Sequence, residues 1–392
     1  MPALSIRLEH FTDSVIRRMT RIANKYDAVN LSQGFPDFDP PEELKTALRE
    51  VAGGSTHQYA ITWGATNFRE ALARKQSRLM GFDIDPETQV VVTCGSTEAM
   101  IASMMTVCNP GDRVIVFSPF YENYSADAIL SGAIPIYVHL RPSHFCFNLD
   151  ELEAAFMQKP KALILCNPSN PTGKVFTRKE LEIIANFAEK YDVFVVTDEV
   201  YEHIVYKPYQ HIYIASLPGM FERTISCSSL SKTYSITGWR LGYVSAPANI
   251  IAEVRKVHDF LTVGAASPLQ EAAITALQFG DDYYLKLQTV YTEKKDFFLR
   301  GLDSLGLKYT VPQGAYYVMV DISEFGATND VEFCEWMARE VGVAAVPGSS
   351  FFKEEIHHLI RFHFAKNIET LKEALERLGN LRTKAMEKRW AK

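Results

Sequence analysis

Several features that mark common classes of protein are missing from this 392-residue sequence. No apolar stretch approaches the roughly 20 uninterrupted residues that a membrane-spanning helix needs. A net charge of -6 gives no electrostatic reason to expect binding to nucleic acid or to a membrane. Residues 1–10 have no basic region followed by an apolar core, so we expect no signal peptide. These absences together predict a cytoplasmic protein.

Cysteine pairs and nucleotide-binding fingerprints are missing as well. No CxxC pair occurs, which favours buried thiols in a reducing compartment over a metal site or a disulfide framework. The six scattered cysteines are Cys94, Cys108, Cys146, Cys166, Cys227 and Cys334. The sequence has neither the GxxxxGK[ST] of a P-loop nor a GxGxxG after its first predicted strand. A phosphate bound by this chain is therefore not expected to belong to ATP or NAD.

Short apolar runs alternate with amphipathic segments through the middle of the chain. The runs, mostly rich in Val, Ile and Phe, are 89–94, 113–117, 134–140, 162–166, 193–197, 224–228 and 241–245. They show little polar alternation, which is typical of strands covered on both faces. Between them, Thr177 and Glu180 form a capping box ahead of an apolar helical stripe. The pattern predicts an α/β fold with a mostly parallel seven-stranded sheet flanked by helices.

The two ends of the chain do not follow this alternation. Four further elements are predicted there: a long helix over 281–305, strands over 315–320 and 359–364, and a surface helix over 368–381. A chain of this length is too long for one ordinary core. We therefore assign residues 46–284 to a large domain, and residues 1–45 with 285–392 to a smaller α+β domain.

Unusual polar residues follow the predicted strands almost every time. They are Gly95–Thr97, Pro119–Tyr121, Asn167–Gly173, Asp198–Tyr201 and Ser229–Lys232. Ligands of parallel sheets bind beyond the carboxyl ends of the strands, so we expect these segments to lie together. Each of them also has an ordinary explanation: the first as a helix cap, Asp198 as a salt-bridge partner. Lys232 is the sharpest signal, because a lysine between two apolar strands loses its proton more easily and becomes a nucleophile.

The segment Ser229–Gly242 resembles the lysine motif of the class I/II aminotransferases, which are fold-type I pyridoxal-phosphate enzymes. Asn-Pro-Ser-Asn-Pro-Thr-Gly at 167–173 and Asp-Glu-Val-Tyr at 198–201 precede it in the family's order. The resemblance covers nearly the whole chain. Within the family, the chain is most similar to the kynurenine/glutamine transaminase and methionine aminotransferase branch, on the segments Leu31–Phe38, His57–Ala60 and Val331–Trp336.

The resemblance implies a binding site for pyridoxal 5'-phosphate. Lys232 would carry the cofactor as a Schiff base and move the proton, and Asp198 would keep the pyridine nitrogen protonated. Tyr201 and Asn170 would bind the ring hydroxyl oxygen, and Tyr121 would stack on the ring. The phosphate would be gripped by Ser96, Thr97, Ser229 and Arg240.

The resemblance also implies a substrate clamp and a second subunit. Arg361, which alternates with Ile360 and Phe362, would bind the substrate carboxylate with help from Asn170 and the backbone of Gly34. An ordinary ion pair is the alternative for Arg361. Tyr59 resembles the tyrosine that reaches a neighbouring subunit's phosphate, so the resemblance implies a homodimer with shared sites.

The expected activity is transfer of an amino group from an L-amino acid to a 2-oxo acid. Neutral donors with sulfur-containing, amide or aromatic side chains are preferred. Two departures from some relatives disfavour kynurenine itself: Val263 and Gly264 stand in place of a Phe-His pair, and an aromatic residue expected near Ile16 is absent. Three alternatives stay open: an aspartate aminotransferase, a cysteine-conjugate β-lyase, and a non-enzymatic regulator. The intact Lys232, Asp198 and Arg361 disfavour the regulator. Such regulators usually carry an added DNA-binding domain, and only about 30 residues precede the first motif.

Overall fold

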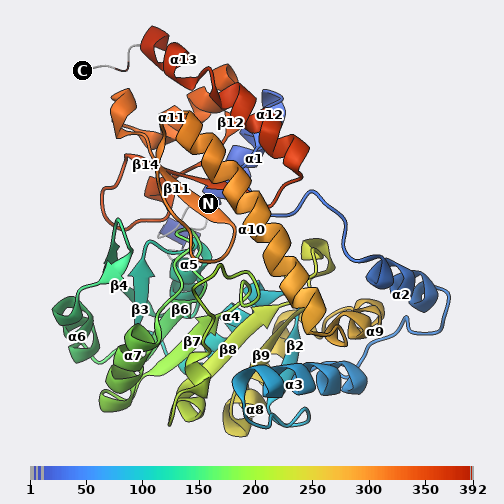
Figure 1. Ribbon diagram of the computed structural model, residues 1–392. Helices are drawn as coiled ribbons and strands as arrows, with labels where there is room; N and C mark the ends of the chain where they lie inside the picture. The colour runs from blue at the N-terminus through green and yellow to red at the C-terminus, as the bar shows by residue number, and fades with distance from the viewer. Residues whose placement is uncertain (1–3, 6–7, 10–12, 389, 391–392) are drawn as a thin grey trace.

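A computed structural model describes residues 4–5, 8–9, 13–388 and 390. Residues 1–3, 6–7 and 10 of the segment in which we expect no signal peptide lie outside the described residues. Figure 1 shows a large sheet with helices around it and a smaller group of strands and helices above. The long helix α10 (Asp281–Ser304) runs from α9 (Ser267–Leu277), beside the large sheet, into the upper group.

The large sheet contains eight strands in the order β2-β9-β8-β7-β6-β3-β4-β5. Their bounds are β2 (Val90–Thr93), β3 (Arg113–Ser118), β4 (Ile134–Arg141), β5 (Cys146–Phe147), β6 (Ala162–Cys166), β7 (Phe194–Asp198), β8 (Thr224–Ser229) and β9 (Gly242–Ser245). Strands β4, β3, β6, β7 and β8 run parallel, and β9 is antiparallel to both of its neighbours. The α/β prediction is confirmed with all seven predicted strands. The eighth strand, β5, was not predicted, because two residues carry no periodic signal.

Apolar side chains cover both faces of this sheet, as the lack of polar alternation predicted. Ile115, Leu163 and Val195 pack on one face, with helices α6 (Leu149–Met157) and α7 (Arg178–Lys190). Their chain neighbours Val114 and Val196 point to the other face, because successive strand residues alternate. That face is covered by α4 (Ser96–Val107), α5 (Asn123–Leu130) and α8 (Ala248–Thr262). The predicted capping box is present at the start of α7.

Three more helices extend the edge of the large sheet near β2. Helix α3 (Thr66–Met80) shares a buried cluster with α9, and α2 (Glu42–Ala52) packs on α9 at the right of Figure 1. None of the helices in the described part of the chain is long and apolar enough to cross a membrane.

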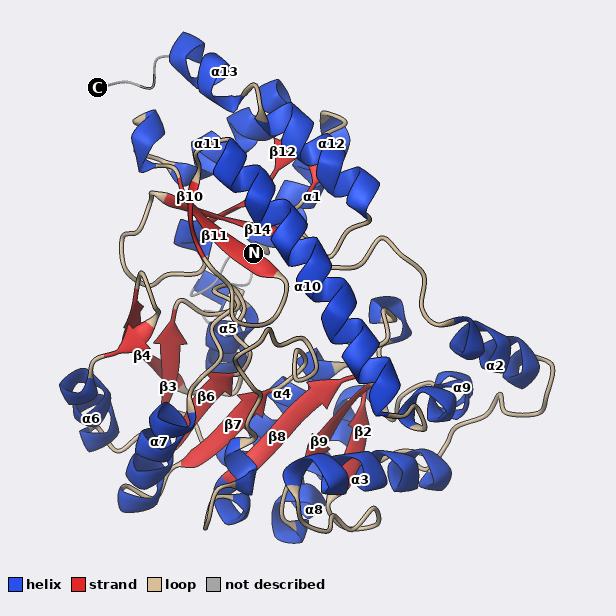
Figure 2. Ribbon diagram, in the orientation of Figure 1, coloured by secondary structure: helices blue, strands red, loops and turns tan. Residues whose placement is uncertain are grey.

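The upper group contains a separate antiparallel sheet in the order β10-β11-β14-β13. Its strands are β10 (Lys308–Thr310), β11 (Tyr317–Asp321), β13 (Val346–Pro347) and β14 (Leu359–His363), and a parallel pair is formed by β1 (Val29–Asn30) with β12 (Val343–Ala344). The surrounding helices are α1 (Val15–Lys25), α10, α11 (Asp330–Trp336), α12 (Ile368–Leu378) and α13 (Leu381–Lys388). Figure 2 shows these helices around the upper strands. The four elements predicted for the C-terminal part are present, whereas the domain boundary at 284/285 falls inside α10 and stays a prediction.

Most of the cysteines lie inside the protein. Four of them are buried, Cys94 is half-buried, and Cys146 is exposed on the edge strand β5. The expectation of buried thiols is therefore wrong for Cys146, because the short edge strand leaves its side chain outside the core.

Candidate active site

One cavity of about 390 Å³ opens between the large sheet and the upper strands. Every site residue predicted from the sequence lines it, except Tyr59. The large sheet contributes residues at or beyond the carboxyl ends of β3, β6, β7 and β8. The upper group contributes Arg361 from β14, Tyr317 from β11 and the segment around Gly34. The polar segments thus come together as the parallel topology predicted.

Lys232 lies in this cavity and donates a hydrogen bond from Nζ to the Gly34 carbonyl oxygen at 3.0 Å. Burial lowers the pKa of Lys232 to about 8. The negative charge of Asp198 opposes that shift, and the positive charges of Arg240 and Arg361 add to it. An amine with this pKa exists in both protonation states near neutral pH, so it can act as nucleophile and as base.

Asp198 ends strand β7 and is buried. Burial raises the pKa of Asp198 to about 6, while hydrogen bonds and Lys232 favour the charged form. The Tyr124 hydroxyl donates to Oδ2 at 2.7 Å, and the Val200 N–H points at Oδ1 at 3.4 Å. A carboxylate in these surroundings stabilises a positive charge on a group that binds close to it.

Arg361 is completely buried on β14, and its charge is only partly satisfied by protein groups. Nη1 donates to Asn170 Oδ1 at 2.6 Å, and Nη2 donates to the Ser32 carbonyl at 2.7 Å. Nε has no hydrogen-bond partner among the described residues. The guanidinium lies between the rings of Tyr317 and Phe351, whose centroids are 4.3 and 4.6 Å from it. A buried cation with an unused donor at a cavity wall fits a carboxylate ligand.

Another part of the cavity lining fits a phosphate. Helix α4 begins at Ser96, and no side chain caps its first N–H groups. The residue before it, Gly95, has a φ of 84°, and a Cβ there would lie 2.4 Å from the Arg240 Nη2 atom. Glycine therefore lets Arg240 approach the helix start. The hydroxyl side chains that line the same cavity include Ser96, Thr97, Ser229 and Thr237. Helix N-termini, hydroxyls and guanidinium groups are the usual phosphate ligands.

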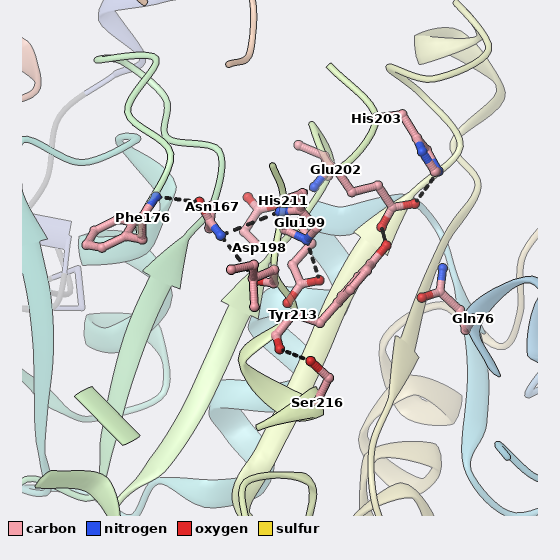
Figure 3. Close-up of polar contacts among 12 residues, drawn as sticks. Gln76, Asn167, Phe176, Asp198, Glu199, Glu202, His203, His211, Tyr213 and Ser216 are labelled. Atoms are coloured by element: carbon pink, nitrogen blue, oxygen red, sulfur yellow. Dashed lines mark hydrogen bonds and ion pairs between the residues drawn. The ribbon is translucent and has the colours of Figure 1, made fainter. Parts of the chain in front are cut away.

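A network of buried polar side chains holds the loop that follows β7 in place (Figure 3). Glu202 forms an ion pair with Lys75 at 2.6 Å and accepts a hydrogen bond from the Tyr213 hydroxyl at 2.9 Å. Burial by itself raises the pKa of Glu202, but Lys75 and His203 together outweigh burial and hold that pKa well below its usual range.

The same network reaches the motif that follows β6. His211 lies between Asn167 Nδ2, 3.5 Å from its Nδ1 atom, and Glu199 Oε2, 3.4 Å from its Nε2 atom. An amide NH₂ can only donate, so Nδ1 accepts and Nε2 donates to Glu199. These contacts fix the two loops that carry Asn170 and Tyr201.

Several cavity residues were not predicted from the sequence. Tyr124 and Tyr317 touch Asp198 and Tyr201, but both look like ordinary core aromatics in their segments. Arg17 and Glu122 also line the cavity. Glu122 accepts hydrogen bonds from the Ser14 hydroxyl and the Val15 N–H, which join the start of α1 to the segment after β3. Contacts between segments so far apart in the chain cannot be predicted from local sequence patterns.

Comparison with known proteins identifies the family. A family model described as aminotransferase class I and II matches residues 26–378. The chain belongs to the class I and II aminotransferases. It is a transaminase, and the fold and family expected from the motifs are confirmed.

Relatives of known name cover nearly the whole of this aminotransferase. The methionine aminotransferase of Escherichia coli is 38% identical over 96% of this chain and 97% of its own. The kynurenine–oxoglutarate transaminase 1 of Homo sapiens is 36% identical over 91% of this chain and 93% of its own. A solved Escherichia coli methionine aminotransferase is 37% identical and superimposes with a TM-score of 0.93, covering 97% of this chain and 100% of its own.

Proposed function

We propose that this aminotransferase uses pyridoxal 5'-phosphate to move the amino group of a neutral L-amino acid to a 2-oxo acid. One observation carries the proposal: a single cavity holds a lysine with a pKa lowered to about 8, the uncapped start of α4 with Arg240, and a buried arginine. Donors with sulfur-containing, amide or aromatic side chains are favoured. The names of the similar proteins support this, as do the apolar residues Ile16 and Phe35 in the cavity lining.

The residues present fit pyridoxal 5'-phosphate. The uncapped start of α4 with Arg240 would hold its phosphate, and Asp198 would face its ring nitrogen. Tyr201 and Asn170 would bind its ring hydroxyl oxygen, and Tyr121 would cover the ring face. When bound, this cofactor supplies an electron sink that stabilises negative charge at the substrate α-carbon.

The side chains divide the remaining work. Arg361 binds the substrate carboxylate and orients the α-carbon, because a planar guanidinium accepts a carboxylate in one geometry. Lys232 accepts a proton from that carbon and returns it, since its pKa of about 8 keeps part of the amine free near neutral pH. Asp198 keeps a proton on the ring nitrogen by its negative charge in a low-dielectric site.

A single-turnover spectrum against a panel of L-amino acids tests the proposed donors. Loss of the near-visible cofactor absorbance with methionine, glutamine or phenylalanine, and little loss with aspartate, supports neutral donors. Fast conversion by aspartate alone would make this an aspartate aminotransferase, with Arg17 at the cavity wall as a candidate partner of the second carboxylate. Release of pyruvate and ammonia from a cysteine conjugate would indicate β-lyase activity. A protein that takes up no cofactor overturns the proposal.

Arg361→Ala is expected to weaken the binding of every α-carboxylate substrate by about 2–4 kcal/mol, which lies within the range for truncating one partner of a buried charge pair. The dissociation constant of an unreactive carboxylate analogue measures this loss. Arg361→Lys should recover only part of it, because an ammonium cannot bind the carboxylate with two parallel hydrogen bonds. The exposed Arg382 offers a matched control, since Arg382→Ala should leave the affinity unchanged. Unchanged affinity in Arg361→Ala would move the carboxylate clamp elsewhere.

We also propose a homodimer in which Tyr59 contributes to the partner's phosphate site. Tyr59 is 86% exposed and lies outside the cavity of its own chain. Its segment is joined to the end of α8 by a hydrogen bond from His258 Nε2 to the Thr62 carbonyl at 2.8 Å. Phe260, on that helix, is 92% exposed. Large apolar side chains that are exposed on joined segments are typical of a surface that a second copy covers. The unpaired cysteines favour the cytoplasm for this dimer.

Tyr59→Phe is expected to weaken cofactor retention roughly tenfold or more, the effect of losing one hydrogen bond to a charged group. Tyr209→Phe, at another exposed tyrosine, is the control. Mixed dimers locate the effect. A Tyr59→Phe chain paired with a Lys232→Ala chain should retain the cofactor normally, because its only competent site receives an intact partner tyrosine. A chain with both changes paired with a wild-type chain should show the defect. The reverse pattern would refute the shared site.

A further inference from the structure

Tyr317 is a buried cavity residue that contacts three parts of the site at once. Its hydroxyl oxygen lies 2.8 Å from the Tyr201 hydroxyl oxygen. Its ring lies 4.3 Å below the Arg361 guanidinium. A Cβ on Gly34 would lie 2.2 Å from the Tyr317 hydroxyl, so only glycine lets that segment pack here. Tyr317 thus contacts both the tyrosine of the Asp-Glu-Val-Tyr motif and the arginine clamp.

The hydrogen bond between the two tyrosines must have a direction. Each hydroxyl has one proton to donate, so only one of the two oxygens accepts in this contact. If Tyr201 donates its proton to an acceptor in the cavity, Tyr317 must donate to Tyr201. The neighbouring Tyr316 cannot take that place, because its hydroxyl donates to the Gly34 carbonyl at 2.9 Å.

The surroundings favour Tyr317 as the donor. Burial raises the pKa of both tyrosines, but Arg361 counteracts burial at Tyr317, whereas the pKa of Tyr201 is raised well above its usual value. The more acidic hydroxyl of a pair is the better donor. A hydroxyl that accepts a hydrogen bond becomes a stronger donor itself, since the bonds in a chain polarise one another.

We propose that Tyr317 is a positioning residue with two separable parts: its hydroxyl directs and strengthens the hydrogen bond that Tyr201 donates into the cavity, and its ring supports Arg361. The inference rests on the proposed function, in which the acceptor of Tyr201 is the ring hydroxyl oxygen of the cofactor and the ligand of Arg361 is the substrate carboxylate. The two parts predict different defects in different variants.

Tyr317→Phe removes the hydroxyl and keeps the ring. A weaker hydrogen bond from Tyr201 stabilises a negative ring oxygen less. The protonated form of the lysine-bound cofactor therefore becomes more stable relative to the deprotonated form. We expect the midpoint of the near-visible absorbance titration to rise by roughly half a pH unit, the size of one neutral hydrogen bond. The KM for L-methionine should change less than twofold. Tyr317→Leu removes the ring as well and should raise that KM by roughly 3- to 30-fold, as expected for a lost cation–π contact.

Two controls separate positioning from a general disturbance of the core. Tyr291 is an equally buried tyrosine that stacks on Tyr316, with centroids 5.7 Å apart, and its hydroxyl has no partner within the described part of the chain. Tyr291→Phe should therefore leave the midpoint in place. In a Tyr201→Phe background, Tyr317→Phe should cause no further shift, because the hydroxyl it acts through is gone.

The titration of cofactor-loaded protein tests the positioning role without measuring turnover. A midpoint that moves in Tyr201→Phe but not in Tyr317→Phe overturns the positioning role and leaves the proposed function intact. An equal shift from Tyr317→Phe in the wild-type and Tyr201→Phe backgrounds also overturns it. If wild-type protein shows no near-visible absorbance with pyridoxal 5'-phosphate, the proposed function fails, and this inference fails with it.

Discussion

Lys232→Ala is expected to abolish transamination, lowering the turnover rate by at least about 10⁴-fold, the upper end of what one general acid–base group contributes. The loss should be this large because Lys232 is the only lysine in the described cavity and serves both as nucleophile and as base. The variant should also lack the near-visible absorbance of the lysine-bound cofactor. Stopped-flow turnover and an absorbance spectrum of the loaded protein measure the two effects separately.

Lys232→Arg tests whether charge alone is sufficient at this position. An arginine stays protonated at every accessible pH, so this variant should be as inactive as the alanine variant. In the wild-type protein, the rate of cofactor uptake should rise with pH through about 8, because the free amine is the reacting form. A Lys232→Ala protein that kept both absorbance and turnover would refute the lysine assignment.

Lys75→Met is expected to destabilise the protein by about 3–5 kcal/mol, the cost of leaving one charge of a buried ion pair without its partner. Lys75 on α3 and Glu202 lie 2.6 Å apart, and both side chains are almost completely enclosed. The denaturant midpoint of the loaded protein measures the loss. Because Glu202 directly follows Tyr201, cofactor retention should weaken together with stability.

A double-mutant cycle separates the ion pair from the hydrogen bonds around it. Glu202→Gln removes the charge and keeps a side chain that accepts from Tyr213, so the double variant Lys75→Met/Glu202→Gln should be more stable than the sum of the single changes predicts. The folded-state pKa of Glu202 is depressed, so its contribution is present above the unfolded value. The contribution is then lost as pH falls through the folded pKa. Strictly additive changes would show that the pair is not coupled.

Much of the large sheet could be predicted because its signal is local. Runs such as 162–166 and 193–197 are almost entirely apolar, and this composition alone indicates a strand that is covered on both faces. The edge strand β5 and the exposed Cys146 escaped prediction for the opposite reason. Two residues at a sheet edge bury too little to be recognised from their composition.

The residues of the site also divide into those that could be predicted from the sequence and those that could not. Lys232 and Asp198 stand out in the sequence because a charged residue beside an apolar strand requires an explanation. Tyr124 and Tyr317 do not stand out, because an aromatic side chain in an apolar segment is ordinarily part of a core. Their hydroxyls can be assigned to the site only because they form hydrogen bonds with partners 74 and 116 residues away in the chain.

The sequence by itself determined the α/β class, the seven main strands, the aminotransferase family, and the lysine, aspartate and arginine that line the cavity. Only the tertiary structure decided which hydroxyls reach Asp198 and Tyr201, and that Glu202 is paired with Lys75. The physical reason is that hydrophobic periodicity acts between near neighbours in the chain. Hydrogen bonds and buried ion pairs instead depend on distances of about 3 Å between atoms that only the folded chain brings together.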